Sequence, residues 1–162
     1  MGLIYKEATV NDIDILTETR IEVLRAANKL SDHVDMSEVE KQSYEYYKRA
    51  LSDNTHIAYL VFDNDIFVGA GGVSFFQVMP TYQNPSGKKA YIMNMYTRPE
   101  HRRKGIAYKT LDILVRASKD RGITVISLEA TDMGRGLYEK YGFEKMSHEM
   151  ELLNYPLAHE KT

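Results

Sequence analysis

The spacing of hydrophobic positions changes along the chain, and each change marks an expected element of secondary structure. In the first third, apolar residues such as Ile13, Leu16 and Val23 recur near one face of a helix. After Thr55, consecutive runs are rich in β-branched and aromatic residues, a composition typical of strands. The pattern therefore predicts mainly helices before Thr55, and strands combined with helices after it.

Strands and helices alternate after the first two helices, and their order predicts the fold class. The strand–helix–strand arrangement near the end implies a parallel, right-handed crossover. Such an order indicates an α/β (α+β) fold in which helices cover a mixed sheet. The expected elements are strands at Leu3–Ala8, His56–Phe62, Ile66–Val78, Ala90–Thr97, Ile123–Ala130 and Phe143–Leu153, helices from Thr9 to about Asn28, from Ser37 to about Leu51, from Gly105 to Gly122 and from about Gly134 through Tyr138 to Gly142, and loops at Lys29–Met36 and Met79–Lys89.

Local signals support several of these boundaries. Thr9 with Asp12 and Ser37 with Glu40 have the spacing of capping boxes, which begin helices. The sequence Asp63-Asn64-Asp65 between two strand-like runs predicts a hairpin.

Two strands carry additional signals. Gly69, Gly71 and Gly72 interrupt the second hairpin strand and predict a bulge or a close backbone approach. Simple alternation predicts which side chains share a face of the following strand. It places Ile92, Asn94 and Tyr96 on one face and Tyr91, Met93, Met95 and Thr97 on the other, and it makes Phe143, Met146, Met150 and Leu152 candidate core residues of the last strand.

Composition narrows the class of protein. The chain has 162 residues, of which 43% are hydrophobic and 27% charged, as expected for a single globular domain spanning residues 1–162. A net charge of −2 gives no general attraction to nucleic acid or to an anionic membrane. The absence of cysteine excludes disulfides, thiolate zinc sites and a cysteine nucleophile. No metal-ligand spacing, apolar leader or membrane-length run is evident, so we expect a cytoplasmic protein without a metal.

A basic turn between a strand and a helix is the most informative stretch of the chain. Residues 99–107 read Pro-Glu-His-Arg-Arg-Lys-Gly-Ile-Ala, and an amphipathic helix follows them. Backbone N–H groups at a helix N-terminus suit a phosphate group, and Arg102, Arg103 and Lys104 add cations. Gly105 lets a bulky anion approach the backbone. Two interpretations remain at this point, a pyrophosphate-binding turn or a solvated basic start of a helix.

A second segment decides between these interpretations. The stretch Arg102-Arg103-Lys104-Gly105-Ile106-Ala107 fits the acyl-CoA turn R/Q-x-x-G-x-G/A, and Gly136-Leu137-Tyr138-Glu139-Lys140-Tyr141-Gly142-Phe143 looks like the segment LYEKxGF. With both segments in this order, the chain resembles the GNAT superfamily of acyl-CoA-dependent N-acyltransferases over essentially its full length. The resemblance favours the pyrophosphate-binding turn.

This resemblance implies a fold and a cofactor site. The fold is a central mixed, mostly antiparallel sheet, splayed at the acyl-CoA site and flanked by about four helices. The pantetheine arm is expected to pair with strand backbone, and the pyrophosphate with N–H groups of the turn. The implied cofactor-binding residues are Met95, Tyr96, Thr97, Arg102, Arg103, Lys104, Gly105, Ile106 and Ala107.

The resemblance also implies an N-acetyltransferase that moves an acetyl group from acetyl-CoA to a primary amine of a small molecule. Tyr138 matches the general acid that protonates the thiolate, although its ring could instead only pack on the sheet. A backbone N–H near Met95 is expected to stabilise the oxyanion. Glu129 is the candidate base, with a solvated strand-end carboxylate as the alternative. Asn94 could position the substrate or satisfy a buried backbone group.

The acceptor side is less defined. His33 and Glu38 lie between the first two helices, where the superfamily often builds its acceptor pocket, but a surface loop explains them equally well. His56 and His101 are expected on the surface. Two other functions stay open, a protein or peptide N-acetyltransferase and a catalytically weak acyl-CoA-binding regulatory module. The resemblance also allows a homodimer, since superfamily members commonly associate through their last strands.

Overall fold

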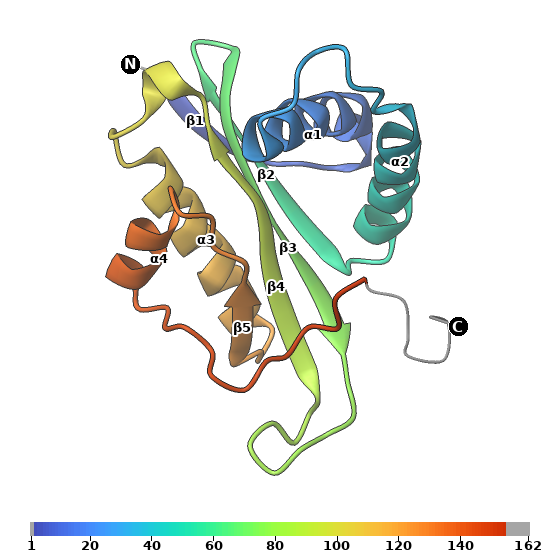
Figure 1. Ribbon diagram of the computed structural model, residues 1–162, viewed down its shortest axis with the longest axis vertical. Coiled ribbons are helices and arrows are strands. Elements are labelled where there is room, and N and C mark those ends of the chain that lie inside the picture. The colour runs from blue at the N-terminus through green and yellow to red at the C-terminus, as the bar shows by residue number, and fades with distance from the viewer. Residues whose placement is uncertain (1, 155–162) are drawn as a thin grey trace, which may run out of the picture.

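The computed structural model describes residues 2–154, so residues 1 and 155–162 of the expected domain lie outside it. The chain forms a sheet with two helices against each face (Figure 1). The elements are β1 (Leu3–Glu7), α1 (Ile13–Asn28), α2 (Ser37–Ser52), β2 (His56–Asp63), β3 (Ile66–Gln77), β4 (Lys88–Thr97), α3 (Ile106–Asp120), β5 (Val125–Leu128) and α4 (Arg135–Tyr141), with 3₁₀ turns at Val10–Asp12 and Pro99–His101.

The five-stranded sheet has the order β1-β2-β3-β4-β5. The first four strands pair antiparallel, and β5 pairs parallel to β4 after the crossover through α3. This is the mixed, mostly antiparallel sheet that the sequence predicts. The helices α1 and α2 cover one face, and α3 and α4 cover the other (Figure 1).

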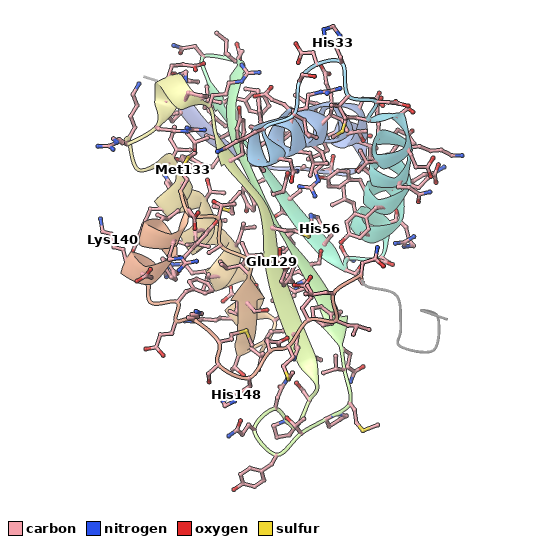
Figure 2. The ribbon with its side chains drawn as sticks, viewed as in Figure 1. His33, His56, Glu129, Met133, Lys140 and His148 are labelled. Carbon is pink, nitrogen blue, oxygen red and sulfur yellow. The ribbon has the colours of Figure 1, made fainter. Side chains whose placement is uncertain are left out.

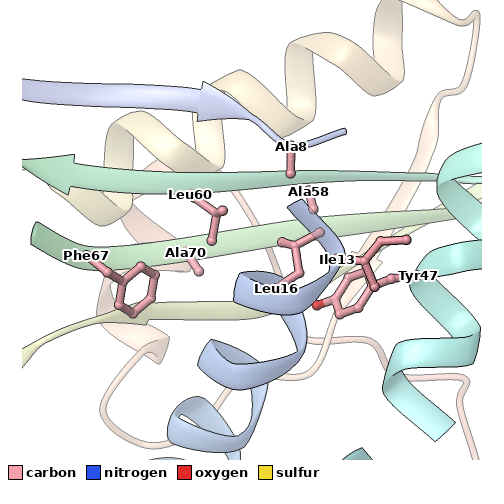
Figure 3. Packing of buried hydrophobic residues seen from close by; sticks show 8 residues of the cluster. All are labelled: Ala8, Ile13, Leu16, Tyr47, Ala58, Leu60, Phe67 and Ala70. Carbon is pink, nitrogen blue, oxygen red and sulfur yellow. The ribbon is translucent and has the colours of Figure 1, made fainter. Parts of the chain in front are cut away.

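Each face of the sheet has its own apolar core. On the α1/α2 face, Leu16, Tyr47 and Leu60 are buried together, as Figure 3 shows. On the α3/α4 face, Leu111 and Leu114 are fully buried against the strands. Burying one such leucine contributes roughly 2 kcal/mol of stability, so the two cores hold the helices to the sheet.

The local signals in the sequence are confirmed in two cases and wrong in one. The Thr9–Asp12 capping box is formed, and the Thr9 N–H donates to Asp12 Oδ2 at 2.8 Å. The β2–β3 turn has positive φ at Asn64 (49°) and Asp65 (68°), as a two-residue hairpin turn requires. The second capping box does not form, because the Asp35 carboxylate already accepts the N–H of Ser37.

A β-bulge in β4 changes the predicted alternation. Met93 pairs with Gly72 and Tyr96 pairs with Ala70, so both Asn94 and Met95 lie opposite Gly71. Asn94 has φ 60°, a left-handed conformation that asparagine tolerates better than most residues. The glycine-rich stretch of β3 therefore marks a bulge, as predicted, although the extra residue belongs to the neighbouring strand.

The bulge makes the predicted grouping of Ile92, Asn94 and Tyr96 wrong. Ile92 packs in the α3/α4 core, whereas Asn94 bonds to α1 and Tyr96 packs in the α1/α2 core. Met95 packs toward α3 and uses the space that Gly71 leaves open. A Cβ at Gly71 would lie 2.8 Å from Met95 Sδ, so the bulge needs a glycine across from it.

The expected last strand, Phe143–Leu153, is not formed. Phe143 packs partly into the α3/α4 core, but the rest of the segment has no strand pairing in the described chain. The other three predicted core residues are exposed, Met146 by 52%, Met150 by 96% and Leu152 by 88%. The weak alternation of this segment provided no continuous apolar face that would hold it against the sheet.

His56 is buried, which contradicts its expected surface position. The hydroxyls of Tyr46 and Ser74 lie 3.0 and 3.1 Å from its Nδ1 and 2.7 Å from each other. Burial, with a smaller effect from the nearby Arg20 charge, lowers the pKa of His56 to about 4. Its side chain is therefore a neutral part of a polar cluster between α2 and the sheet.

We predict that this histidine makes the fold sensitive to acid. Between pH 6.5 and about 4 the unfolded chain protonates His56 while the folded chain does not. Stability therefore falls as the pH falls through this window, by up to roughly 3 kcal/mol. Urea unfolding at several pH values should show that the His56→Asn variant loses less stability between pH 6.5 and about 4 than the unmodified protein does. The exposed His33, replaced by Gln, should leave the loss unchanged; an equal loss in His56→Asn would contradict the prediction.

Candidate active site

The sheet opens between β4 and β5. The two strands pair only from Lys89 opposite Val125 to Ile92 opposite Leu128. Beyond Ile92, β4 continues to Thr97, and no strand of residues 2–154 pairs along its β5 side there. Unpaired strand edges present N–H and C=O groups to an extended partner. The edge at residues 93–97 includes Met95, Tyr96 and Thr97, which the resemblance implies for the pantetheine arm.

The basic turn lies at the end of this open edge. Arg103 has φ 64° and Gly105 has φ 81°, and Lys104 between them has negative φ. Such alternation turns successive N–H groups toward one concave surface that suits an anion. Gly105 is also the N-cap of α3, where no side chain caps the first free N–H groups. A Cβ at Gly105 would meet no atom within 4 Å, so conformation rather than crowding favours glycine.

The three cations of the turn differ in their surroundings. Arg102 Nε donates to the Thr97 carbonyl at 3.0 Å and ties the turn to the end of β4. Arg103 and Lys104 are exposed. Thr97 Oγ1 is buried without a hydrogen-bond partner among the described residues. The concave N–H groups, the free cations and the open strand edge together fit a pyrophosphate joined to an amide-containing arm.

Met95 and Tyr138 come together on the α3/α4 side of the opening. Both belong to the apolar cluster on that face, Tyr138 with 9% exposure. The Tyr138 ring packs against Gly134 and Phe143, while its hydroxyl has no partner in the described structure. Burial raises the pKa of Tyr138, so its proton stays in place at neutral pH.

Glu129 lies on the other side of the opening. It follows the end of β5, where Figure 2 labels it, and its side chain is exposed. Its charge adds to burial in raising the pKa of Tyr91. Tyr91 pairs with Ser74, whose hydroxyl contacts α2, so Tyr91 and its parallel partner in β5 lie on the α1/α2 side. Glu129 is two residues beyond that partner, so it is on the same side of the sheet. Met95 and Tyr138 thus approach the opening from the side opposite Glu129.

Polar contacts from α1 hold the bulged end of β4. The sequence patterns did not predict these contacts. Arg20 Nη1 donates to Asn94 Oδ1 at 2.9 Å. Two residues further along α1, Glu22 accepts from Arg98 Nε and Nη2 at 2.9 and 2.8 Å. Glu22 also contributes, after burial, to the raised pKa of Tyr96, about 12. These partners are 74 and 76 residues apart, and no local pattern signals such pairs.

The remaining candidates do not join this site. His33 is exposed in the α1–α2 loop (Figure 2), and Glu38 is exposed and bonds to Gln42. His101 is partly buried rather than on the open surface, with Nε2 3.4 Å from Asp63 Oδ2. Within residues 2–154, no group of three or more acidic, histidine or cysteine side chains is arranged to hold a metal. No helix in this range combines the length and apolar character needed to cross a bilayer.

Comparison with known proteins supports a family assignment. The sequence model of the acetyltransferase (GNAT) family matches residues 23–143. A predicted acetyltransferase from Clostridium acetobutylicum, solved with acetyl-CoA, is 33% identical, with a TM-score of 0.85 over 94% of this chain and 96% of that one. A comparison with curated protein sequences gives no significant match.

More distant structures share the fold. A GNAT protein from Ralstonia eutropha is 21% identical, with a TM-score of 0.81 over 94% of this chain and 99% of the other. An aminoglycoside acetyltransferase from a soil metagenome is 19% identical, with a TM-score of 0.69 over 98% and 100%. The family match and the mixed sheet with its parallel fifth strand lead to one conclusion: the chain belongs to the acetyltransferase (GNAT) family.

We predict that Gly105→Ala weakens acetyl-CoA binding at least about tenfold, because the added Cβ occupies space above the turn N–H groups and strains φ. Titration calorimetry with acetyl-CoA measures this change. Gly122→Ala is the matched control, since Gly122 has φ 76°, has no atom within 4 Å of an added Cβ, and lies at the other end of α3. Both variants should lose about 1 kcal/mol of stability. Equal affinity of the two variants for acetyl-CoA would refute the assignment of the turn.

Proposed function

We propose that the protein transfers an acetyl group from acetyl-CoA to a primary amine of a small molecule, acting as a cytoplasmic enzyme. The observation that carries this proposal is the open edge of β4 at residues 93–97, with the anion-suited turn at its end. The acetyl-CoA in the Clostridium acetobutylicum structure supports the choice of donor, since that protein is 33% identical.

In this proposal the turn residues 103–107 hold the pyrophosphate through their N–H groups. The edge at Met95, Tyr96 and Thr97 pairs with the pantetheine amides, and Arg102 keeps the turn in register with the strand. Exposed Arg103 and Lys104 add long-range attraction for the phosphates. The thioester then reaches the bulge at Met95, whose side chain packs toward α3.

The chemical step is a direct attack of the amine on the thioester carbon. An alkylammonium has a pKa near 10.4, so a base must take its proton, and Glu129 does so directly or through water. The Met95 N–H stabilises the oxyanion of the tetrahedral intermediate. As the carbon–sulfur bond breaks, the Tyr138 hydroxyl protonates the thiolate. The products are an N-acetyl amide and free coenzyme A thiol.

Detection of released thiol on a panel of acceptors tests the function. The panel contains polyamines, amino sugars, amino acids, their carboxamides and a short peptide with a free N-terminus. We expect release with at least one small amine. Release only with the peptide would favour a peptide N-acetyltransferase, and tight acetyl-CoA binding without any release would favour a regulatory module; either result would overturn the proposal.

We predict that Tyr138→Phe lowers kcat by about 100-fold, because the variant lacks the acid that protonates the thiolate. Acetyl-CoA affinity should stay within about twofold, since the ring and its packing are kept. The matched control is Tyr141→Phe on the same helix, which removes a hydroxyl that donates to Asp112 at 2.7 Å on the surface of α3. Steady-state thiol release and calorimetry measure both variants, and an unchanged kcat in Tyr138→Phe would rule out the acid role.

A further inference from the structure

Arg20 carries donors that the fold does not use. Its guanidinium has five N–H groups, and its Nη1 bond to Asn94 is the one hydrogen bond it makes to the described residues. The side chain is partly buried. Its other N–H groups are not enclosed, because the buried side-chain atoms without partners are on Thr97 and His101. The other donors of Arg20 are therefore unpaired within residues 2–154 and keep some contact with solvent.

The charge of Arg20 is also uncompensated. No carboxylate in residues 2–154 lies within 4.0 Å of it, whereas Arg98 nearby forms a two-bond ion pair with Glu22. The titratable neighbours that act on Arg20 are the hydroxyl of Tyr47 and the ring of His56. Both are neutral at pH 7, since burial raises the pKa of Tyr47 to about 12 and lowers that of His56 to about 4. A partly buried cation without a counter-charge favours binding of an anion.

The position of this cation is relevant to the proposed reaction. Asn94, which holds the guanidinium, is the residue immediately before Met95, and their Cα atoms are about 3.8 Å apart along the chain. Arg20 lies on the α1/α2 side of β4, as Glu129 does, while Tyr138 lies on the α3/α4 side. The anion site is therefore on the side of the candidate base, close to where the amine attacks.

We propose that the acceptor is a primary amine that also carries a carboxylate, and that Arg20 binds this carboxylate with its orientation set by Asn94. The inference rests on the proposed acetyl transfer. A guanidinium fork matches the two oxygens of a carboxylate. One cation balances one negative charge, whereas a phosphate dianion would exceed the single positive charge of Arg20. Amino acids and related amino carboxylates are the acceptor class that fits.

The test compares matched acceptors that differ only in this charge. Amino acids with the amine on the α, β or γ carbon are compared with their carboxamides, and an amine bearing a phosphate forms a third arm. For the best spacing we expect kcat/KM about 10- to 100-fold higher for the carboxylate than for the carboxamide, mainly through KM. A carboxylate raises the pKa of the neighbouring amine, so easier deprotonation cannot produce this preference.

Variants of Arg20 separate recognition from structure. Arg20→Gln should bring the ratio of kcat/KM between the carboxylate and the carboxamide close to one, and Arg20→Lys should restore part of the preference. Arg116→Gln is the control, because Arg116 is a surface residue of α3 that pairs only with Asp112. If Arg20→Gln does not fold, Asn94→Gly keeps the positive φ and frees the guanidinium, and should lower the ratio of kcat/KM between the amino acid and its carboxamide.

The outcomes distinguish the two proposals. Turnover of the amines with equal kcat/KM for carboxylates and carboxamides would overturn the inference while supporting acetyl transfer. A preference for the phosphate-bearing amine, or a preference that survives in Arg20→Gln, would also overturn it. Failure of every amine to release thiol would instead overturn the proposed function. A carboxylate preference that disappears in Arg20→Gln and persists in Arg116→Gln supports the inference.

Discussion

The β-bulge at Asn94 and Met95 is the constraint on which the site depends. An extra residue in β4 shifts the alternation of side chains by one position, so that Asn94 and Tyr96 face α1 and Met95 faces α3. The arrangement requires positive φ at Asn94 and the absence of a side chain at Gly71. Without the bulge, regular alternation from Ile92 would turn Asn94 toward α3 and Met95 toward α1.

The two sides of the opening have different electrostatic character. On the α3/α4 side, Tyr138 lies in an apolar cluster that keeps its hydroxyl protonated. On the α1/α2 side, polar and charged groups such as Arg20, Asn94 and Glu129 gather around β4. An apolar environment keeps a tyrosine hydroxyl protonated, and a polar environment favours recognition of a charged acceptor. The division agrees with a reaction in which donor and acceptor arrive from different faces.

Sequence patterns predicted the features that depend on neighbouring residues. The amphipathic α3, the hairpin turn at Asn64 and Asp65, and the glycine-marked bulge follow from local spacing and backbone preference. Features that depend on distant partners could not be predicted in this way. The burial of His56 depends on Tyr46 and Ser74, which the fold brings together from α2 and β3.

In the candidate site, too, features with local sequence signals could be predicted and features with distant partners could not. The basic turn and the segment around Tyr138 carry continuous motifs and could be located from the sequence. The Arg20–Asn94 contact joins residues 74 positions apart and has no motif. The face of Asn94 was predicted wrongly because strict alternation assumes no inserted residue. The prediction of a final strand failed for a different reason. Residues such as Met150 are exposed, so this segment has no apolar face to bury against the sheet.

The bond from Arg102 to the Thr97 carbonyl has a thermodynamic consequence. It joins the end of β4 to the start of the turn and so limits how far the turn can move relative to the strand. An anion that binds such a turn costs little conformational entropy, because few backbone angles remain to be fixed. Affinity gained through rigidity of this kind depends on the bound state lasting longer rather than on faster encounter.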